Sequence, residues 1–165
     1  MFLLRDQTVV RAPLDRCFLL STSVAIVQKE LGMHPTEGRT TGLVVGGDVV
    51  LWKGRQLGLP QYHKSLISRF EPFRFFQDTM IAGRFAYFQH DHAFTENLDG
   101  TVTLADELRF SMPFGWPGWI VGRLILVPHI RRLMRRRFAL LKHIAESEEW
   151  HIYLSRPEIA SHSLR

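Results

Sequence analysis

Cysteine is almost absent from this chain, and so are long apolar runs. The one cysteine among 165 residues, Cys17, excludes an intrachain disulfide and any CxxC metal site. We expect it to be a small packed side chain inside a helix. The longest apolar run, Leu124–Val127, is far too short to span a membrane, and Arg123 precedes it. The apolar run after Met1 is too short for a signal peptide, so we expect a cytoplasmic protein.

Repeats, low-complexity segments and linkers are also missing. The 45% apolar content is typical of a folded globule, and the length fits one domain. We expect residues 1–148 to form this domain and residues 149–165 to form a C-terminal tail. The protein is expected to be a monomer or a homodimer.

Positive charge gathers in one segment. The formal net charge is +5, and five arginines lie between residues 131 and 137. On a helix, Arg131, Arg132, Arg135 and Arg136 share a face away from the apolar residues. Arg137 lies nearer the apolar boundary, where we expect it to reach a ligand carboxylate or the rim of the cavity. A solvated face is the simpler interpretation, and a module that transiently contacts a membrane surface or a partner is the alternative. No aromatic residue interleaves with this face, so we expect no nucleic-acid partner.

A hairpin between Gly83 and Met112 organises the rest of the chain. Its turn, Asn97-Leu98-Asp99-Gly100, joins turn-forming residues to a glycine that accepts a positive φ. A three-residue loop of this kind sets Asn97 opposite Thr101. Counting outward pairs Phe94 with Leu104, His92 with Asp106, His90 with Leu108, and Phe88 with Phe110. Because side chains alternate along a strand, these eight share one face, which is apolar apart from two imidazoles and one carboxylate.

The remaining segments predict an α+β fold. A first strand at residues 2–11 precedes short helices at 13–20 and 23–31, the second capped by Ser21 or Thr22 and ended by Gly32. Strands at 40–45, 48–56, 59–70 and 74–81 have short connections, which favour an antiparallel meander. Residues 119–148 carry an apolar stripe at helical spacing, and Pro128 should kink this helix or split off its first piece.

Six segments follow one another in a familiar order: Ala12–Arg16, Gly38–Leu43, Asp48–Trp52, Gly83–Phe94, Met112–Gly115 and Arg131–Arg137. In this order, with His90-Asp91-His92 as the most specific motif, the chain resembles the SRPBCC superfamily of START lipid-transfer domains, birch-pollen-allergen proteins and polyketide cyclases. It is most similar to bacterial ligand-binding members of the cyclase/dehydrase type, over about residues 1–148. The resemblance implies a helix-grip fold, in which a curved seven-stranded antiparallel sheet wraps around a long C-terminal helix, with two short helices between strands 1 and 2. It implies no metal and no cofactor.

We expect a hydrophobic or amphipathic ligand, resembling a lipid, polyketide or isoprenoid, in a cavity between the sheet and the long helix. A mostly apolar wall with a few polar groups suits such a molecule. The expected wall consists of Trp52, Phe76, Met80, Phe88, Phe94, Leu108, Phe110, Leu133, Met134 and Phe138. The residues expected to meet the polar end of the ligand are His63, Asp78, His90, His92, Asp106 and Arg137.

His92 and Asp106 allow more than one interpretation. As a buried pair, they would satisfy each other and specify strand register. As an oriented imidazole, His92 would present its second nitrogen to the ligand as a donor, an acceptor or a general base. The last option describes a cyclase- or dehydratase-like enzyme with Asp106 as the orienting group. His90 and His92 with Asp106 and Asp78 could also form a two-histidine carboxylate metal site, which the resemblance does not imply.

The segment Met112–Val127 combines tryptophans with three glycines and two prolines. One hypothesis is a mobile apolar gate at the mouth of the cavity. The alternative is a packed loop that leads into the long helix.

Overall fold

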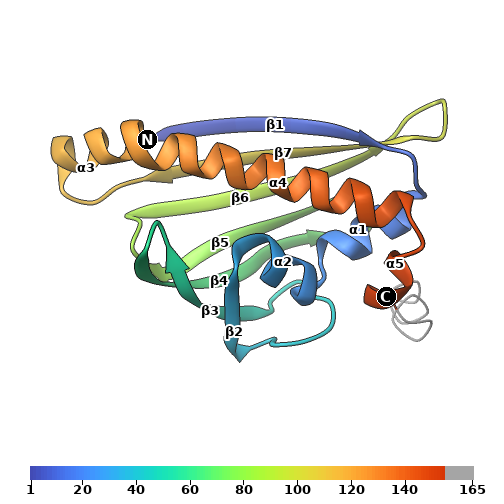
Figure 1. Cartoon of the computed structure of the whole chain (residues 1–165), viewed down its shortest axis with the longest axis horizontal. Helices are drawn as coiled ribbons and strands as arrows, with labels where there is room; N and C mark the ends of the chain where they lie inside the picture. The colour runs from blue at the N-terminus through green and yellow to red at the C-terminus, as the bar shows by residue number, and fades with distance from the viewer. Residues whose placement is uncertain (155–165) are drawn as a thin grey trace.

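The computed structural model describes residues 1–154, which form one antiparallel sheet with a long helix, α4 (Val127–Glu146), lying along it (Figure 1). Neighbouring strands follow the order β1-β7-β6-β5-β4-β3-β2. Their bounds are β1 Phe2–Val10, β2 Met33–Gly38, β3 Val49–Gln56, β4 Leu59–Glu71, β5 Phe75–Gly83, β6 Tyr87–Glu96 and β7 Val102–Ser111. Two short helices, α1 (Leu14–Ser21) and α2 (Val24–Leu31), lie between β1 and β2. The helix-grip architecture predicted from the sequence is confirmed.

The β6–β7 hairpin has the register that its turn predicts. Phe94 faces Leu104, His92 faces Asp106, His90 faces Leu108 and Phe88 faces Phe110. Gly100 has a φ of 77°, and its N–H donates to the carbonyl of Asn97. Every second residue of β7 is buried, from Val102 to Phe110. One side of this hairpin therefore faces the interior along its whole length.

The strand predicted at residues 40–45 is wrong. The second strand is β2, and it contains Pro35, which lacks a backbone donor but is accepted because β2 is an edge strand. Residues 40–45 instead bond to the turn between α1 and α2. Val44 N–H donates to Thr22 O, and Val24 N–H donates to Gly42 O.

The predicted cap of α2 is also wrong, although its predicted end is confirmed. Ser23 occupies the N-cap position without a side-chain bond. The hydroxyls of Ser21 and Thr22 donate back to carbonyls of α1, on Cys17 and Leu19, and are therefore not available as caps. Gly32 ends α2 in the left-handed conformation, with φ 63°.

Pro128 divides the long helix as predicted, but the helical region begins earlier. A first piece, α3 (Gly115–Val121), continues through a π-helical turn at Gly122–Leu126 into α4. A proline ring clashes with the carbonyl four residues before it, and a widened turn relieves this clash. Pro128 then occupies the first turn of α4, where its missing N–H has no cost.

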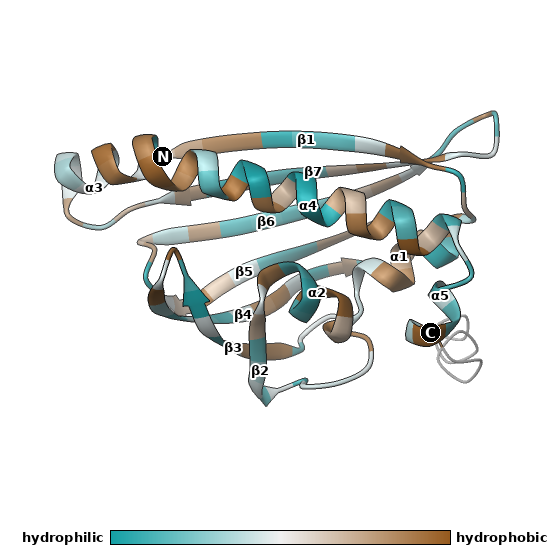
Figure 2. Ribbon diagram, viewed as in Figure 1, coloured by the Kyte–Doolittle hydropathy of each residue, from teal (hydrophilic) through white to brown (hydrophobic). Residues whose placement is uncertain are grey.

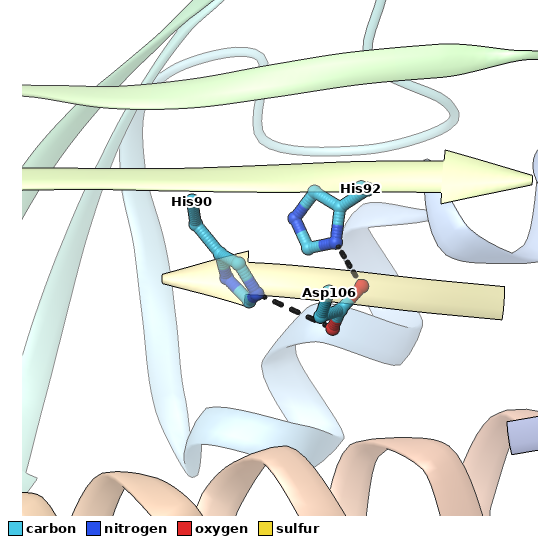
Figure 3. A group of neighbouring side chains, drawn as sticks. All are labelled: His90, His92 and Asp106. Carbon is cyan, nitrogen blue, oxygen red and sulfur yellow. Dashed lines mark hydrogen bonds and ion pairs between the residues drawn. The ribbon is translucent and has the colours of Figure 1, made fainter. Parts of the chain in front are cut away.

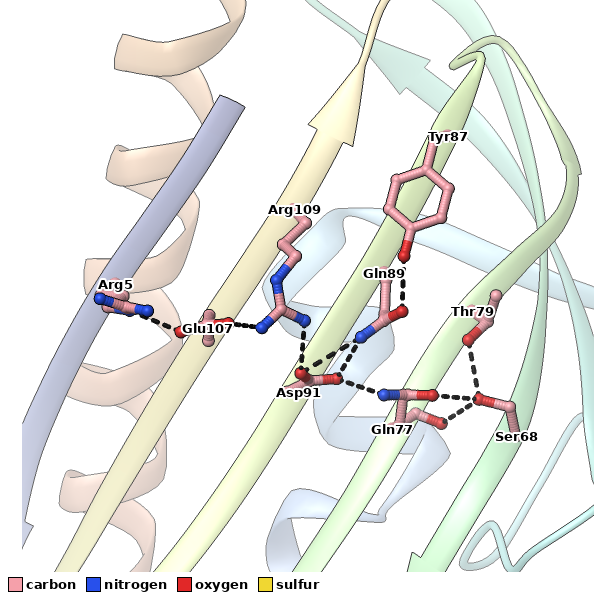
Figure 4. A network of polar contacts seen from close by, with 9 residues as sticks. All are labelled: Arg5, Ser68, Gln77, Thr79, Tyr87, Gln89, Asp91, Glu107 and Arg109. Atoms are coloured by element: carbon pink, nitrogen blue, oxygen red, sulfur yellow. Dashed lines mark hydrogen bonds and ion pairs between the residues drawn. The ribbon is translucent and has the colours of Figure 1, made fainter. Parts of the chain in front are cut away.

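The two faces of the sheet differ in chemistry. The convex face carries a polar network that crosses four strands, from Arg5 through Glu107, Arg109 and Asp91 to Gln77, and reaches a fifth, β4, at Ser68 (Figure 4). Ser68, Thr79, Tyr87 and Gln89 extend this network. The middle residue of the His-Asp-His motif therefore faces away from the two histidines.

The concave face and α4 bury two apolar clusters. One lies around Phe18 and Leu141, near α1, and the other around Phe110 and Met134. Colouring by hydropathy separates brown turns near residues 120–127 from alternating teal and brown along α4 (Figure 2). Within residues 1–154, no helix is long and apolar enough to cross a membrane.

Candidate functional site

A cavity of about 580 Å³ lies between the two apolar clusters. The concave sides of β3, β4, β5 and β6 form one wall, and α2 and α4 form the other. The lining is mainly apolar, with polar side chains from the middle of the sheet and from both helices. Its volume falls within the range of about 300–1,000 Å³ that is typical of small-molecule sites.

Most residues predicted for the wall do line this cavity. They are Trp52, His63, Phe76, Asp78, Phe88, His90, His92, Leu108, Leu133, Met134 and Arg137. They come together because β5 and β6 keep their pairing phase, with Phe76 opposite His92 and Asp78 opposite His90. Irregular register occurs on the other side of β5, where it pairs with β4.

Five predicted residues do not line the cavity. Phe94 and Phe138 belong to the apolar cluster near α1, where the ring of Phe94 lies 5.1 Å from that of Phe18. Phe110 stacks on Phe2 at 5.0 Å. Met80 lies against Gly83, since a Cβ at Gly83 would meet its sulfur at 2.4 Å. Asp106 is covered by the residues that bind it. All five were placed at the cavity by strand alternation or helical periodicity, which identify the face on which a residue lies but not its position along the element.

Asp106 and the two histidines form the centre of the site. Both imidazoles project from β6 toward the carboxylate on β7 (Figure 3). Nδ1 of His92 lies 2.8 Å from Oδ1, and Nε2 of His90 lies 3.2 Å from Oδ2. The ring centroids of His90 and His92 are 4.0 Å apart, and His92 stacks on Phe76 at 4.3 Å.

The ionisation of this pair fixes the tautomer of His92. Burial alone would raise the pKa of Asp106, but His92, Arg137 and His90 outweigh it and hold that pKa well below its usual value. Burial, with His90 beside it, lowers the pKa of His92 to about 3. A neutral His92 therefore donates from Nδ1 to an ionised Asp106. Nε2 of His92 is then an acceptor at the cavity wall, and no group in residues 1–154 bonds to it.

Arg137 lies deeper than its position at the edge of the helical stripe predicts. Its side chain is 3% exposed. Nε donates to Asp106 at 3.0 Å, Nη1 donates to Glu30 at 3.3 Å, and Nη2 lies 3.2 Å from Nδ1 of His92. Burial opposes the charged form, but the two carboxylates raise the pKa of Arg137. The guanidinium thus joins α2, α4 and β7.

Glu30 is a buried, charged residue of the cavity wall that was not predicted from the sequence. It lies on α2 and is 7% exposed, beside Arg137. Burial raises its pKa despite the neighbouring guanidinium. Glu30 lies three residues after Val27 and four after Ile26, which places it on the apolar face of α2. An acidic residue on an apolar helix face is the sequence feature that could have predicted its burial.

Two further titratable side chains on the wall are shifted by burial. Burial raises the pKa of Asp78 to about 7 and lowers that of His63 to about 4. Oδ1 of Asp78 and Nε2 of His90 are buried and have no hydrogen-bond partner among the described residues. Such atoms need a partner, which a bound molecule can supply.

The two histidines and Asp106 also have metal-ligand spacing, with ligand atoms within 4.8 Å of one another. However, Arg137 bonds to the same carboxylate and contacts Nδ1 of His92. A cation here would meet a buried guanidinium at close range, so this donor set suits hydrogen bonding better than a metal.

The cavity opens beside the β3–β4 hairpin and the helical segment before α4. Leu57, Leu59, Val121 and Ile125 line this mouth and are also exposed to solvent. Of the segment expected to act as a gate, Phe114, Trp116 and Trp119 are 85%, 76% and 54% exposed and do not line the cavity.

Comparisons with protein-family models and with curated proteins give no match. Solved structures match across most of the chain. The Zhui aromatase/cyclase from Streptomyces sp. R1128 has a TM-score of 0.69 and 13% identity, covering 94% of this chain and 98% of its own. Ginseng major latex-like protein 151 from Panax ginseng has a TM-score of 0.63 and 12% identity, covering 88% and 98%. A START superfamily protein from Mycobacterium smegmatis has a TM-score of 0.58 and 10% identity, covering 84% and 98%.

These likenesses concern the fold, because identity is low throughout. At that level, they confirm the helix-grip fold that the resemblance implied. The chain is a helix-grip protein.

Proposed function

We infer that this protein binds a hydrophobic or amphipathic small molecule, such as a lipid, polyketide or isoprenoid, in the cavity between the sheet and α4. The observation that carries this inference is the cavity itself, about 580 Å³ in volume and mainly apolar in lining. Burial of apolar ligand surface there contributes on the order of 25 cal/mol per Å². The polar groups on β5 and β6 orient one end of the ligand.

The test is binding of an uncharged fluorescent probe, N-phenyl-1-naphthylamine, to the purified chain. Leu133 lines the cavity from α4, so Leu133→Trp narrows the cavity and should weaken binding about tenfold or more. Leu124→Trp is the matched control, because Leu124 is 70% exposed and lies outside the wall. Absence of probe binding to the unaltered chain, or equal binding to both variants, contradicts the proposal.

An enzyme of the cyclase or dehydratase kind is the second candidate. It is favoured by an imidazole that Asp106 holds at Nδ1 and that leaves Nε2 to the cavity. The lowered pKa of His92 weighs against it, since a general base works best with a pKa near the operating pH. On a synthetic linear polyketide thioester, His92→Gln should abolish turnover but preserve binding. Equal turnover by the variant removes His92 from the reaction.

Contact with a membrane surface is a third candidate. The mouth combines exposed Leu57, Leu59 and Ile125 with Arg84 on the wall. Arg131, Arg132, Arg135 and Arg136 are exposed on α4. We expect salt-dependent binding to phosphatidylserine vesicles that weakens in Leu59→Ser and in Arg132→Gln/Arg136→Gln. Equal binding by all three proteins contradicts surface contact.

A further inference from the structure

One guanidinium and two carboxyl groups, those of Arg137, Glu30 and Asp78, line the polar end of the cavity, and the carboxylate of Asp106 lies behind them, bonded to Arg137. These charges restrict the charge of a ligand. We propose that the bound molecule carries an uncharged hydroxyl, of an alcohol or a phenol, that bonds to Asp78 and His90. This proposal rests on the ligand-binding function proposed above and specifies the chemical class of the ligand.

The first step concerns Arg137, the cation of this site. A guanidinium in an apolar cavity commonly binds a ligand carboxylate. Here, Nε and Nη1 of Arg137 already donate to Asp106 and Glu30 at 3.0 and 3.3 Å. All three side chains are buried, so the guanidinium charge is compensated within the protein. An anionic ligand would add a further negative charge to a site that already holds two carboxylates for one cation.

The second step concerns the atoms that lack partners. Asp78 and His90 lie opposite each other on β5 and β6, so their side chains are neighbours on the cavity side. Oδ1 of Asp78 and Nε2 of His90 are the two buried side-chain atoms in residues 1–154 without a hydrogen bond. Nε2 of His90 is 3.2 Å from Asp106 but does not form a hydrogen bond with it. We place the polar group of the ligand between these two atoms.

The third step matches donors to acceptors. A hydroxyl donates one hydrogen bond and accepts others, so it can donate to Asp78 and accept from His90. A carboxylate only accepts and would face the carboxyl of Asp78. Nε2 of His90 lies 3.2 Å from the ionised carboxylate of Asp106, which favours the tautomer with the proton on Nε2. An ammonium only donates and cannot accept from that N–H. Of these three groups, only the hydroxyl can form hydrogen bonds with both unpaired atoms.

The groups facing Asp78 support the same assignment. They are His90 on β6, Ser65 on β4, Arg137 on α4 and Glu30 on α2. Burial outweighs them and raises the pKa of Asp78 to about 7, so this carboxyl changes charge near neutrality. At about pH 8 it is mainly ionised and accepts a bond from a hydroxyl, while repelling an anion.

The experiment is displacement of N-phenyl-1-naphthylamine by dodecanol, dodecanoate, dodecylammonium and dodecyl methyl ether at about pH 8. We expect dodecanol to bind about tenfold more tightly than dodecanoate, and more tightly than the ammonium or the ether, which lacks the hydroxyl proton. Tighter binding of dodecanoate, dodecylammonium or the ether than of the alcohol overturns the assignment. Failure of the dye to bind is a different outcome and overturns the proposed function itself.

Two variants distinguish recognition of the hydroxyl by this site from tighter binding that results only because an alcohol is more hydrophobic than an ion. Glu30→Gln removes one carboxylate from Arg137 and should tighten the binding of dodecanoate about tenfold relative to that of dodecanol. Glu96→Gln, at an exposed position, should change neither. Asp78→Leu should weaken dodecanol but not its methyl ether. Thermal denaturation checks the folding of each variant. An unchanged ratio of acid to alcohol in a folded Glu30→Gln, or of alcohol to ether in a folded Asp78→Leu, refutes the proposal.

Discussion

Arg137 on α4 donates a hydrogen bond of 3.0 Å to Asp106 on β7, and both side chains are 3% exposed. The bond joins the long helix to the middle of β7, which is the second strand from one edge of the sheet. Since Arg137 also donates to Glu30, it connects two helices to one strand. Arg137 therefore forms part of the cavity wall, and its two carboxylate partners compensate the positive charge that a ligand would otherwise meet.

Arg137→Ala should destabilise the protein strongly, because the change leaves two buried carboxylates without their cation. We expect a loss of about 3–5 kcal/mol in the free energy of unfolding, measured by urea denaturation. Arg136→Ala is the control, since Arg136 is exposed, and it should change stability by less than about 0.5 kcal/mol. Similar losses in both variants would mean that the buried pairing contributes nothing.

Asp78→Asn should alter the dependence of stability on pH. The folded pKa of Asp78, about 7, is above the unfolded value of 3.8, so between these values the folded state binds more protons. Stability supplied by the protonated carboxyl is therefore lost as pH rises from about 4 to about 7. Relative to Asp78→Asn, the unaltered chain should lose about 1 kcal/mol per pH unit over this interval. Parallel stability curves would contradict the raised pKa.

His92→Gln tests a group whose stability contribution depends on pH in the opposite direction. The folded pKa of His92 is about 3 and the unfolded value 6.5, so the unfolded state binds more protons between them. The contribution of His92 to stability is fully present above about pH 6.5 and is lost as the pH falls toward 3. The variant should lessen this acid sensitivity by about 1 kcal/mol per pH unit. His151→Gln, on the exposed side of α5 (Trp150–Tyr153), should retain it.

Gly118→Ala should loosen α3. A Cβ at Gly118 would lie 1.8 Å from the carbonyl oxygen of Pro113, which is backbone and cannot rotate away. Overpacking of this kind costs about 1–3 kcal/mol, so hydrogen exchange of residues 112–127 should accelerate. Ile120→Ala, at an exposed position, should leave this exchange nearly unchanged. Equal exchange in both variants would contradict the tight approach.

The sequence predicted local relationships well. The turn at Asn97–Gly100 determines the register of β6 and β7 by counting, and this places His92 opposite Asp106. Pro128 identified the division of the helix because proline acts on its own backbone. In these cases, the cause lies within a few residues of the effect.

Long-range relationships were not predictable in the same way. Glu30 meets Arg137 only because α2 and α4 pack together, and 107 residues separate them. The strand containing Pro35 was missed because its tolerance for proline depends on lying at the edge of the folded sheet. Periodicity also gave no means to distinguish Phe94 and Phe138, in the packed cluster, from Phe76 and Phe88, on the cavity wall.

The π-helical turn at Gly122–Leu126 sets the orientation of α3 about the axis of α4. Such a turn contains one residue more than an α-helical path, and each residue of an α-helix turns the chain by about 100°. Deleting a single residue there would swing the tryptophans of α3 around the helix axis by about a quarter of a rotation. The residues at the entrance to the cavity therefore depend on the length of this one turn.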